Sequence, residues 1–194
     1  LLCALAIVSR AAPDTQGGGA ACYNVSAASA AGLVEATAMR NPLDISPEVK
    51  SALNRNQPVV ALESSLIAHG LPAPVNFETA LAMEDVVCAA GAMPATIGVI
   101  EGVIRVGLSR DQIERLGKKN AAKPAVRDLP NAIMRNLDGG TTVSATMRIA
   151  ATAGIPVMAT GGIGGVHRGF SDTLDISADL WELARTPTVV VSAG

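Results

Sequence analysis

Short apolar runs alternate with segments that carry helix-boundary signals from residue 45 to the end of the chain. Three of the runs have the length of buried strands: PVVALE (58–63), PVMAT (156–160) and TVVVSAG (188–194). Strands that alternate with helices favour a mainly parallel sheet with helices on both faces. We therefore predict an α/β fold, and we expect its sheet to be incomplete at the C-terminus because the chain stops as its last strand ends.

Capping residues indicate where the helices begin. Ser46, Pro47 and Glu48 have the order of an N-cap, a first-turn proline and a first-turn acid. Ser109, with a glutamine three residues on, has the pattern of a capping box, and Asn76 is predicted to cap a third helix. The predicted helices lie within residues 46–56, 76–90, 109–117, 139–154 and 177–185.

One hairpin and one irregular stretch complete the expected fold. The β-rich runs ATIGVI and VIRV flank Glu101 and Gly102, which predicts an antiparallel hairpin. The basic stretch from Lys123 through RDLP is predicted to be irregular. No internal repeat is visible.

Residues 1–44 have a different composition, dominated by alanine, serine and glycine with little charge. We interpret them as a low-complexity or targeting extension, for which a signal segment and an organellar transit peptide both stay open. The folded part is therefore expected over residues 45–194.

Composition and charge exclude several classes of function. Hydrophobic residues make up 49% of the chain, which is enough for a globular core, but aromatic residues make up only 2%, so stacking on bases is not expected. The 15 Lys and Arg residues against 17 Asp and Glu residues leave no basic footprint for a nucleic-acid polymer. No apolar run is long enough to span a membrane. Three cysteines without CxxC spacing suggest neither disulfides nor zinc, which fits an intracellular protein, cytoplasmic or organellar.

Glu63 is the first candidate for chemistry because it ends the strand PVVALE. Groups at the carboxyl ends of strands face the ligand crevice in open α/β sheets, and a partly desolvated carboxylate there is suited to proton transfer. The functional interpretation is a general acid. A carboxylate that points to water or caps the next turn is an equal alternative.

The segment GGTTV (139–143) places flexible backbone and two hydroxyls at a predicted helix start. Free N–H groups and the positive end of the helix dipole favour a phosphate there. Lys123 could add a cation to such a site. The alternative is ordinary capping by Thr141 or Thr142, with Lys123 solvated.

Two further motifs follow the strand PVMAT. GGIGGVHRG has four glycines in five positions, which lets backbone approach a ligand closely, but it lacks the spacing of the dinucleotide fingerprint. His167 in this loop is either a proton carrier or substrate contact, or a residue that structures the loop. In DISAD, Asp175 could hold a hard divalent metal while Ser177 and Asp179 meet a polar substrate, or Asp175 or Ser177 could be a simple N-cap.

Four segments together, VALESSLIAHG, GGTTVSATM, ATGGIGGVHRG and DISADL, resemble the pseudouridine-5′-phosphate glycosidase family, also known through indigoidine synthase A-like proteins. The resemblance runs from about Ile45 to Gly194 in order and spacing. It implies reversible cleavage of the carbon–carbon bond between uracil and ribose in pseudouridine 5′-phosphate, giving uracil and ribose 5-phosphate. It also implies manganese as the metal, and a lysine that holds C1′ of the opened ribose as an imine.

The resemblance assigns roles to individual residues. Glu63 in ALESS matches the proton donor, and Asp175 in DISAD matches the metal ligand. The positions that match substrate contacts are Lys123, Val143, Ser177, Ala178 and Asp179. The motifs GGTTV and GGIGGVHRG add Thr142 and His167 as candidates. Lys123 is followed here by PAVRDLP where the family has VSRRDLP, so its local backbone is expected to differ.

The resemblance also implies that the imine-forming lysine lies two positions beyond Gly194. We therefore expect the front portion of a glycosidase, inactive on its own, whose full-length form is a homo-oligomer acting on a small molecule. A binding module that keeps the phosphosugar site without turnover is the main alternative. An unrelated nucleotide-binding α/β domain ranks third because no dinucleotide or P-loop motif supports it.

Overall fold

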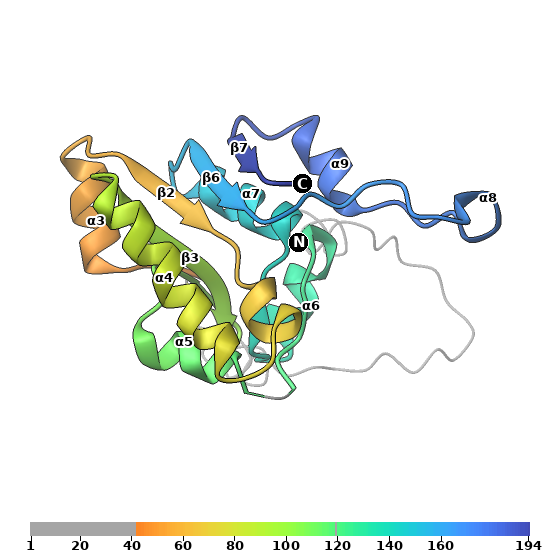
Figure 1. The fold of residues 1–194 in the computed structure, drawn as a ribbon, viewed down its shortest axis with the longest axis horizontal. Coiled ribbons are helices and arrows are strands. Elements are labelled where there is room, and N and C mark those ends of the chain that lie inside the picture. The colour runs from red at the N-terminus through yellow and green to blue at the C-terminus, as the bar shows by residue number, and fades with distance from the viewer. Residues whose placement is uncertain (1–41, 119) are drawn as a thin grey trace, which may run out of the picture. The chain divides into compact units, whose positions relative to one another are not determined.

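The computed structural model describes residues 42–118 and 120–194, so the predicted extension lies almost wholly outside the described residues. A seven-stranded sheet has the order β1-β4-β3-β2-β6-β7, and β5 also pairs with β3 (Figure 1). Four of its pairings are parallel, whereas β3 runs antiparallel to β4 and β5, so the predicted mainly parallel sheet is confirmed. The strands are β1 (Leu43–Ile45), β2 (Val59–Leu62), β3 (Met93–Ile100), β4 (Val103–Val106), β5 (Gly139–Gly140), β6 (Val157–Thr160) and β7 (Val189–Ser192).

Two predicted helix starts are confirmed in detail. The side chain of Ser46 accepts a hydrogen bond from the N–H of Val49 at 3.3 Å, and Ser109 forms a reciprocal capping box with Gln112. The helices are α3 (Pro47–Asn54), the π-helix η2 (Leu66–Gly70), α4 (Val75–Ala89), α5 (Arg110–Leu116), the 3₁₀ turn η3 (Val126–Asp128), α6 (Leu129–Met134), α7 (Val143–Thr152), α8 (Phe170–Thr173) and α9 (Ala178–Leu183).

The cap predicted at Asn76 is wrong. Helix α4 begins at Val75, and Asn76 is buried one residue inside it. Its amide nitrogen donates hydrogen bonds to the carbonyl oxygens of Ile67 at 2.9 Å and Gly117 at 3.3 Å. A residue with cap chemistry is used here to join three helical segments, which local sequence does not reveal.

The stretch around RDLP, predicted to be irregular, forms η3 and α6. Pro130 lies in the first turn of α6, where its missing N–H has no helical partner to lose. The carboxylate of Asp128 accepts a hydrogen bond from the N–H of Ala125 at 3.0 Å and closes the preceding turn. The proline therefore starts a helix instead of breaking one.

The hairpin predicted at Glu101 and Gly102 is confirmed, since Ile100 pairs with Val103 and both turn residues have positive φ. The helix predicted within residues 139–154 is α7, with Thr142 at its N-cap position. Gly139 and Gly140 form β5, and a Cβ on Gly140 would lie 2.5 Å from the carbonyl oxygen of Ser64. Only glycine allows this close approach.

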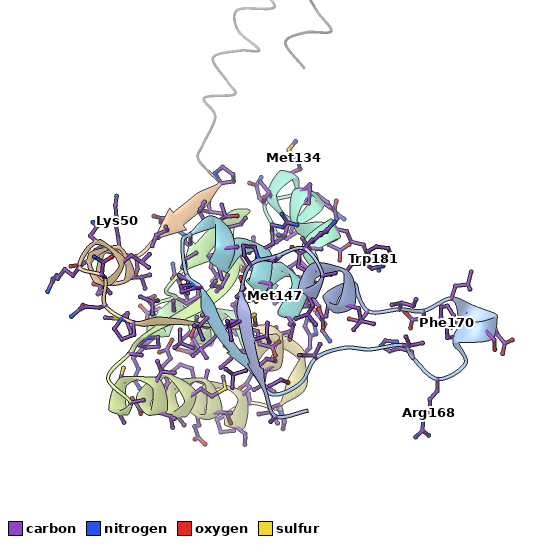
Figure 2. All side chains as sticks on the ribbon, turned by 90° about the horizontal axis from the view of Figure 1, so that it is seen from above. Lys50, Met134, Met147, Arg168, Phe170 and Trp181 are labelled. Atoms are coloured by element: carbon purple, nitrogen blue, oxygen red, sulfur yellow. The ribbon has the colours of Figure 1, made fainter. Side chains whose placement is uncertain are left out.

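The core lies on both faces of β3, whose last six residues are buried. Ile97 and Val99 belong to a cluster that includes Met147 of α7, whereas Ile100 belongs to a second cluster with Ile113 of α5. Figure 2 shows Met147 among the packed elements. Among residues 42–118 and 120–194, no helix combines the length and the apolar character needed to cross a bilayer.

Candidate functional site

Two neighbouring strand ends define the site. Strands β2 and β6 are parallel neighbours, with Leu62 paired to Ala159, so Glu63 and Thr160 lie side by side at their carboxyl ends. From β2 the chain next enters β3 on one side, and from β6 it next enters β7 on the other. Such a reversal of direction is a topological switch point, where α/β sheets form their ligand crevices.

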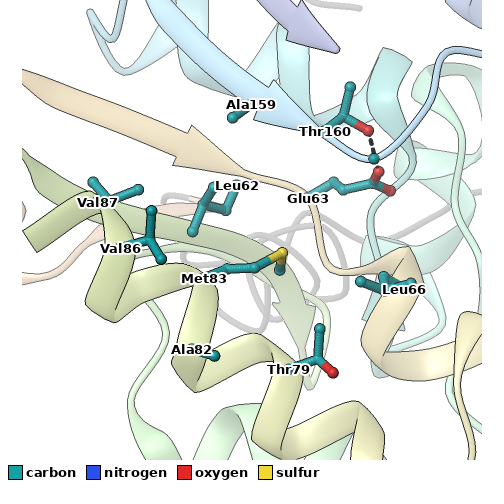
Figure 3. Close-up of a pocket in the computed structure, with 11 residues that line it drawn as sticks. Leu62, Glu63, Leu66, Thr79, Ala82, Met83, Val86, Val87, Ala159 and Thr160 are labelled. Atoms are coloured by element: carbon teal, nitrogen blue, oxygen red, sulfur yellow. Dashed lines mark hydrogen bonds between the residues drawn. The ribbon is translucent and has the colours of Figure 1, made fainter. Parts of the chain in front are cut away.

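The carboxylate of Glu63 is half-buried and is held by two hydroxyl groups. Ser65 donates a hydrogen bond to its Oε2 atom, and Thr160 donates one to its Oε1 atom. Figure 3 shows the second of these bonds between the ends of β2 and β6. Both carboxylate oxygens are therefore fixed by side chains that sequence reasoning did not select.

Buried hydroxyls tie the loop after Glu63 to the start of α7. Ser64 Oγ donates to the carbonyl oxygen of Ile97 at 2.5 Å and accepts from the N–H of Thr141 at 2.9 Å. Thr141 Oγ1 donates to the same carbonyl oxygen at 2.7 Å. Because both hydroxyls are fully buried, these bonds set the position of the catalytic candidate relative to α7.

A polar pocket of about 290 Å³ opens beside Glu63. It gathers eight of the nine residues that the sequence selected, which come from positions as far apart as 63 and 179. These are Glu63, Lys123, Thr142, Val143, His167, Ser177, Ala178 and Asp179, joined by Ser65, Ala125, Ser144, Gly162 and Gly164. The roles assigned to these residues stay predictions, but the structure places them around one cavity.

The start of α7 forms one wall of this pocket, and an acidic side chain already contacts it. Asp179 Oδ1 accepts a hydrogen bond from the N–H of Ser144 at 2.8 Å, and Asp179 Oδ2 accepts one from the N–H of Gly164 at 2.9 Å. Thr142 is the N-cap residue of α7 by position, without a capping bond from its side chain. A phosphate at this helix start would therefore share it with a carboxylate, and the exposed Lys123 on the pocket wall supplies a compensating charge.

Helix α9, which carries Asp179, is anchored to α7 by a buried ionic group. Glu182 is fully buried and pairs with Arg148 of α7 at 2.7 Å and with Arg185 at 2.9 Å. Burial alone would raise the pKa of Glu182, but hydrogen bonds from Thr186, Arg185 and Arg148 outweigh it and hold this pKa below its ordinary value. The anchor keeps Ser177 and Asp179 against the start of α7.

Asp175, the ninth selected residue, lies outside the pocket lining on a hairpin arm (residues 163–177), which extends away from the sheet in Figure 1. Its Oδ2 atom lies 2.6 Å from Nδ1 of His167, and its backbone carbonyl accepts from the N–H of His167 at 3.1 Å. His167 thus connects Asp175 to the pocket. Figure 2 shows Arg168 and Phe170 projecting from the same arm.

The donor atoms around Asp175 suit a hydrated cation better than a protein-enclosed one. No group of three or more His, Cys, Asp and Glu side chains that could hold a metal occurs in the described part of the chain. One exposed carboxylate, which keeps room for several waters, is the arrangement by which Mg²⁺-like cations bind together with substrate phosphates. The residues present therefore fit a cation held mainly by water and ligand.

An apolar groove of about 410 Å³ also borders Glu63, between α4 and the ends of β2 and β6 (Figure 3). Its lining includes Leu62, Leu66, Met83, Val86 and Ala159. Glu63 lines both the groove and the polar pocket.

This fold and site define an α/β protein whose polar side chains gather at a topological switch point. Within that class, the chain belongs to the family described as "Indigoidine synthase A like protein", whose model matches residues 48–194. The pseudouridine-5′-phosphate glycosidase of Hahella chejuensis is 58% identical over 154 residues, which cover 78% of this chain and 51% of that protein. The enzyme of the same name from Escherichia coli is 56% identical, over 78% of this chain and 49% of that protein.

Two solved structures share the fold. A prealnumycin C-glycosynthase in complex with ribulose 5-phosphate superposes with a TM-score of 0.72 at 46% identity, covering 80% of this chain and 50% of that one. An indigoidine synthase A-like protein from Thermotoga maritima superposes with a TM-score of 0.70 at 32% identity, covering 78% and 49%. The chain spans about half the length of the relatives that it matches.

Proposed function

We propose that this chain is part of an enzyme that catalyses the reversible reaction of pseudouridine 5′-phosphate with water to give uracil and ribose 5-phosphate. In this reaction the bond between uracil C5 and ribose C1′ breaks, C5 gains a proton, and C1′ gains the hydroxyl of water. The relatives with this activity in their names are 54–58% identical to the chain.

One observation supports the proposal above the others. The polar pocket collects every residue that the family resemblance matched to the proton donor or to substrate contacts, although these residues are spread over the chain. A chance resemblance would not bring such distant positions to one cavity.

Glu63 is proposed to move the proton between enzyme and the uracil carbon. Its place at the boundary of the polar pocket and the apolar groove lets the phosphosugar lie on one side and the planar base on the other. The base would meet mainly apolar walls, and exclusion of water there strengthens the interaction of Glu63 with the reacting carbon.

The phosphate end is proposed to bind between Lys123 and the start of α7. Lys123 supplies a positive charge, and the hydroxyl of Thr142 and the backbone of Val143 lie at the helix start beside it. Asp179 sets the limit of the phosphate subsite because its carboxylate repels a second anion. Ser177 and Ala178 line the adjacent wall, next to the ribose in this arrangement.

A divalent cation, which we propose to be Mn²⁺, would be held by Asp175. When bound, it would offset the charge of the phosphosugar and orient it. His167 is hydrogen-bonded to Asp175 and lies on the pocket wall. It would therefore connect the cation site to the substrate site.

The experiment is a pair of measurements on residues 1–194. Isothermal titration should show binding of ribose 5-phosphate, and an assay of uracil release from pseudouridine 5′-phosphate should show no turnover, because the resemblance places the imine-forming lysine beyond Gly194. Substitution of Lys123 by Met should weaken binding roughly tenfold through the loss of one charge-assisted contact. The matched control is Lys118→Met, which removes an exposed lysine that pairs with Glu114.

Four results would count against the proposal in different ways. Absence of phosphosugar binding would remove the site assignment itself. Equal binding of ribose and ribose 5-phosphate would remove the phosphate subsite. Turnover or a borohydride-trapped imine on this chain would show that a lysine within residues 1–194 is the nucleophile. Binding without turnover in any longer protein that contains this segment would establish the binding-module alternative.

A second candidate activity is the formation of a carbon–carbon bond between a pentose phosphate and an apolar ring. The apolar lining of the groove beside Glu63 favours it, because uracil has polar edges that this lining does not match. A competition assay distinguishes the two: uracil should displace a bound aromatic probe in the first case and should fail to do so in the second.

A further inference from the structure

Thr160 lies between Glu63 and the loop GGIGGVHRG (161–169), which we call the glycine loop. The hydroxyl of Thr160 contacts both Glu63 and this loop. It donates a hydrogen bond to Glu63 Oε1, shown as a dashed line in Figure 3. The same oxygen lies 3.1 Å from the carbonyl oxygen of Gly162 and 3.2 Å from the N–H of Gly162, from which it accepts. The hydroxyl therefore has two possible acceptors for its single proton.

This arrangement offers a partner to either protonation state of Glu63. When Glu63 is ionised, the hydroxyl proton of Thr160 points at Oε1. When Glu63 carries a proton on Oε1, the threonine oxygen can accept it and turn its own proton to the carbonyl oxygen of Gly162, since a hydroxyl is both donor and acceptor. The N–H of Gly162 keeps its acceptor in both cases.

Ser65 provides a contrast on the other carboxylate oxygen. Its hydroxyl donates to Glu63 Oε2 from a position two residues along the same loop. Thr160, by contrast, belongs to β6 and is 97 residues away in sequence. The orientation of the Glu63 carboxylate therefore depends on the end of β6 and on the glycine loop, as well as on its own loop.

We propose that Thr160 is a positioning residue for proton transfer by Glu63, an inference that rests on the proposed function of Glu63. It fixes the orientation of Oε1 of Glu63. When Glu63 gains or loses its proton, the hydroxyl of Thr160 rotates between the carbonyl oxygen of Gly162 and Oε1. When Glu63 gives its proton to the substrate, the O–H bond of Glu63 breaks and a bond to the substrate carbon forms. Thr160 keeps its own proton throughout. The other charged or titratable groups on the pocket wall are Lys123, His167 and Asp179.

The first test is spectroscopic and needs no turnover. Glutamate labelled with ¹³C at the side-chain carboxyl gives one signal per residue, and Glu63→Gln identifies the signal of Glu63. At neutral pH, Thr160→Val should move this signal by more than its line width, because an isosteric methyl replaces the donor. Thr160→Ser should leave it in place. The control Thr152→Val, which removes an exposed hydroxyl bonded to the carbonyl of Arg148, should also leave it in place.

The second test is kinetic, in a full-length protein that contains this segment. Thr160→Val should lower kcat about tenfold, as expected for a misdirected general acid, with KM for pseudouridine 5′-phosphate unchanged. Thr160→Ser should restore kcat. If no glycosidase activity is found at all, the proposed function fails, while the carboxyl signal still decides the role of Thr160. An unchanged signal in Thr160→Val, or an equal change in Thr152→Val, would overturn the inference, as would a rise in KM without a fall in kcat.

Discussion

The carboxylate of Asp179 and the backbone N–H of Ser144 form a hydrogen bond of 2.8 Å that joins α9 to the start of α7. The second oxygen of the same carboxylate accepts from the N–H of Gly164, so one buried side chain fixes two walls of the polar pocket. A Cβ on Gly164 would meet the side chains of Ser177 and Asp179, which explains the glycine at that point of the loop.

Replacement of Asp179 by Asn should therefore disturb the pocket more than its small change in shape suggests. The amide offers one acceptor where two N–H groups need one each, so about 1–3 kcal/mol of stability should be lost. Urea denaturation checks this value. Asp172→Asn, on the exposed α8, is the matched control and should leave the midpoint unchanged. Equal stability of the two variants would contradict the role given to Asp179.

A cation held by Asp175 should be lost with its carboxylate. We expect Asp175→Ala to weaken Mn²⁺ binding at least tenfold, as measured by the electron paramagnetic resonance signal of free Mn²⁺ in the presence of ribose 5-phosphate. Asp172→Ala on the same arm should bind Mn²⁺ as the unchanged chain does. The prediction fails if both variants bind equally.

The buried Glu182 should give the chain an acid-sensitive anchor. Its pKa is held below the ordinary value of 4.5, so its ionic contacts stabilise the fold fully above the unfolded value and are lost as pH falls through the folded one. We expect the melting temperature to drop as the pH falls below about 4.5. Glu182→Gln should be less stable at pH 7, by roughly 3 kcal/mol. Its melting temperature should also depend less on pH in the acid range.

The control for this pH dependence is Glu114→Gln, which changes an exposed glutamate on α5. This variant should keep the steep fall of the melting temperature at acid pH, and its stability at pH 7 should be unchanged. If the melting temperature of Glu182→Gln still falls steeply at acid pH, the acid sensitivity belongs to other carboxylates.

The valines of β7 should affect solubility and stability separately. Val189 and Val191 are 62% and 58% exposed, whereas Val190 between them packs against the core. In the described residues β7 pairs only with β6, and an exposed apolar edge favours association between chains. We expect Val189→Thr with Val191→Thr to raise the concentration at which the chain precipitates without lowering its melting temperature.

Val190→Thr is the matched substitution for the other face of β7. It places a hydroxyl against the core and should cost about 1–2 kcal/mol. If the outward pair lowers stability as much as Val190→Thr does, the exposed face of β7 is packed in solution.

Local sequence predicted those elements whose signals are local. The caps at Ser46 and Ser109 and the turn at Glu101 involve bonds within a few residues, and all three are confirmed. Asn76 was assigned wrongly because its amide bonds to Ile67 and Gly117, which only the tertiary fold brings near. The strand at Gly139–Gly140 was missed for the same reason, since its partner β3 lies about forty positions earlier.

Sequence motifs identified eight residues that line the polar pocket, because carboxylates at strand ends and glycine-rich segments are visible in the sequence itself. Glu63 and Asp179 stood out as carboxylates at a strand end and a helix start. Ser65 and Thr160 did not, because a hydroxyl at a strand end is common and its value depends on a partner that sequence does not show. The available signal was that each lies within two residues of a strand end already selected, one after PVVALE and the other closing PVMAT.

The contact between Glu63 and Thr160 also has a consequence for the order of folding. Its two residues are separated by 97 positions, so nothing local can form it, and the pocket is completed only when β6 has joined β2. A ligand in this pocket therefore binds the finished sheet and not its parts. Saturating ribose 5-phosphate at 100 times its dissociation constant should raise the free energy of unfolding by about 2.7 kcal/mol. Partly folded chains would not respond, which makes the phosphosugar a probe of completed assembly.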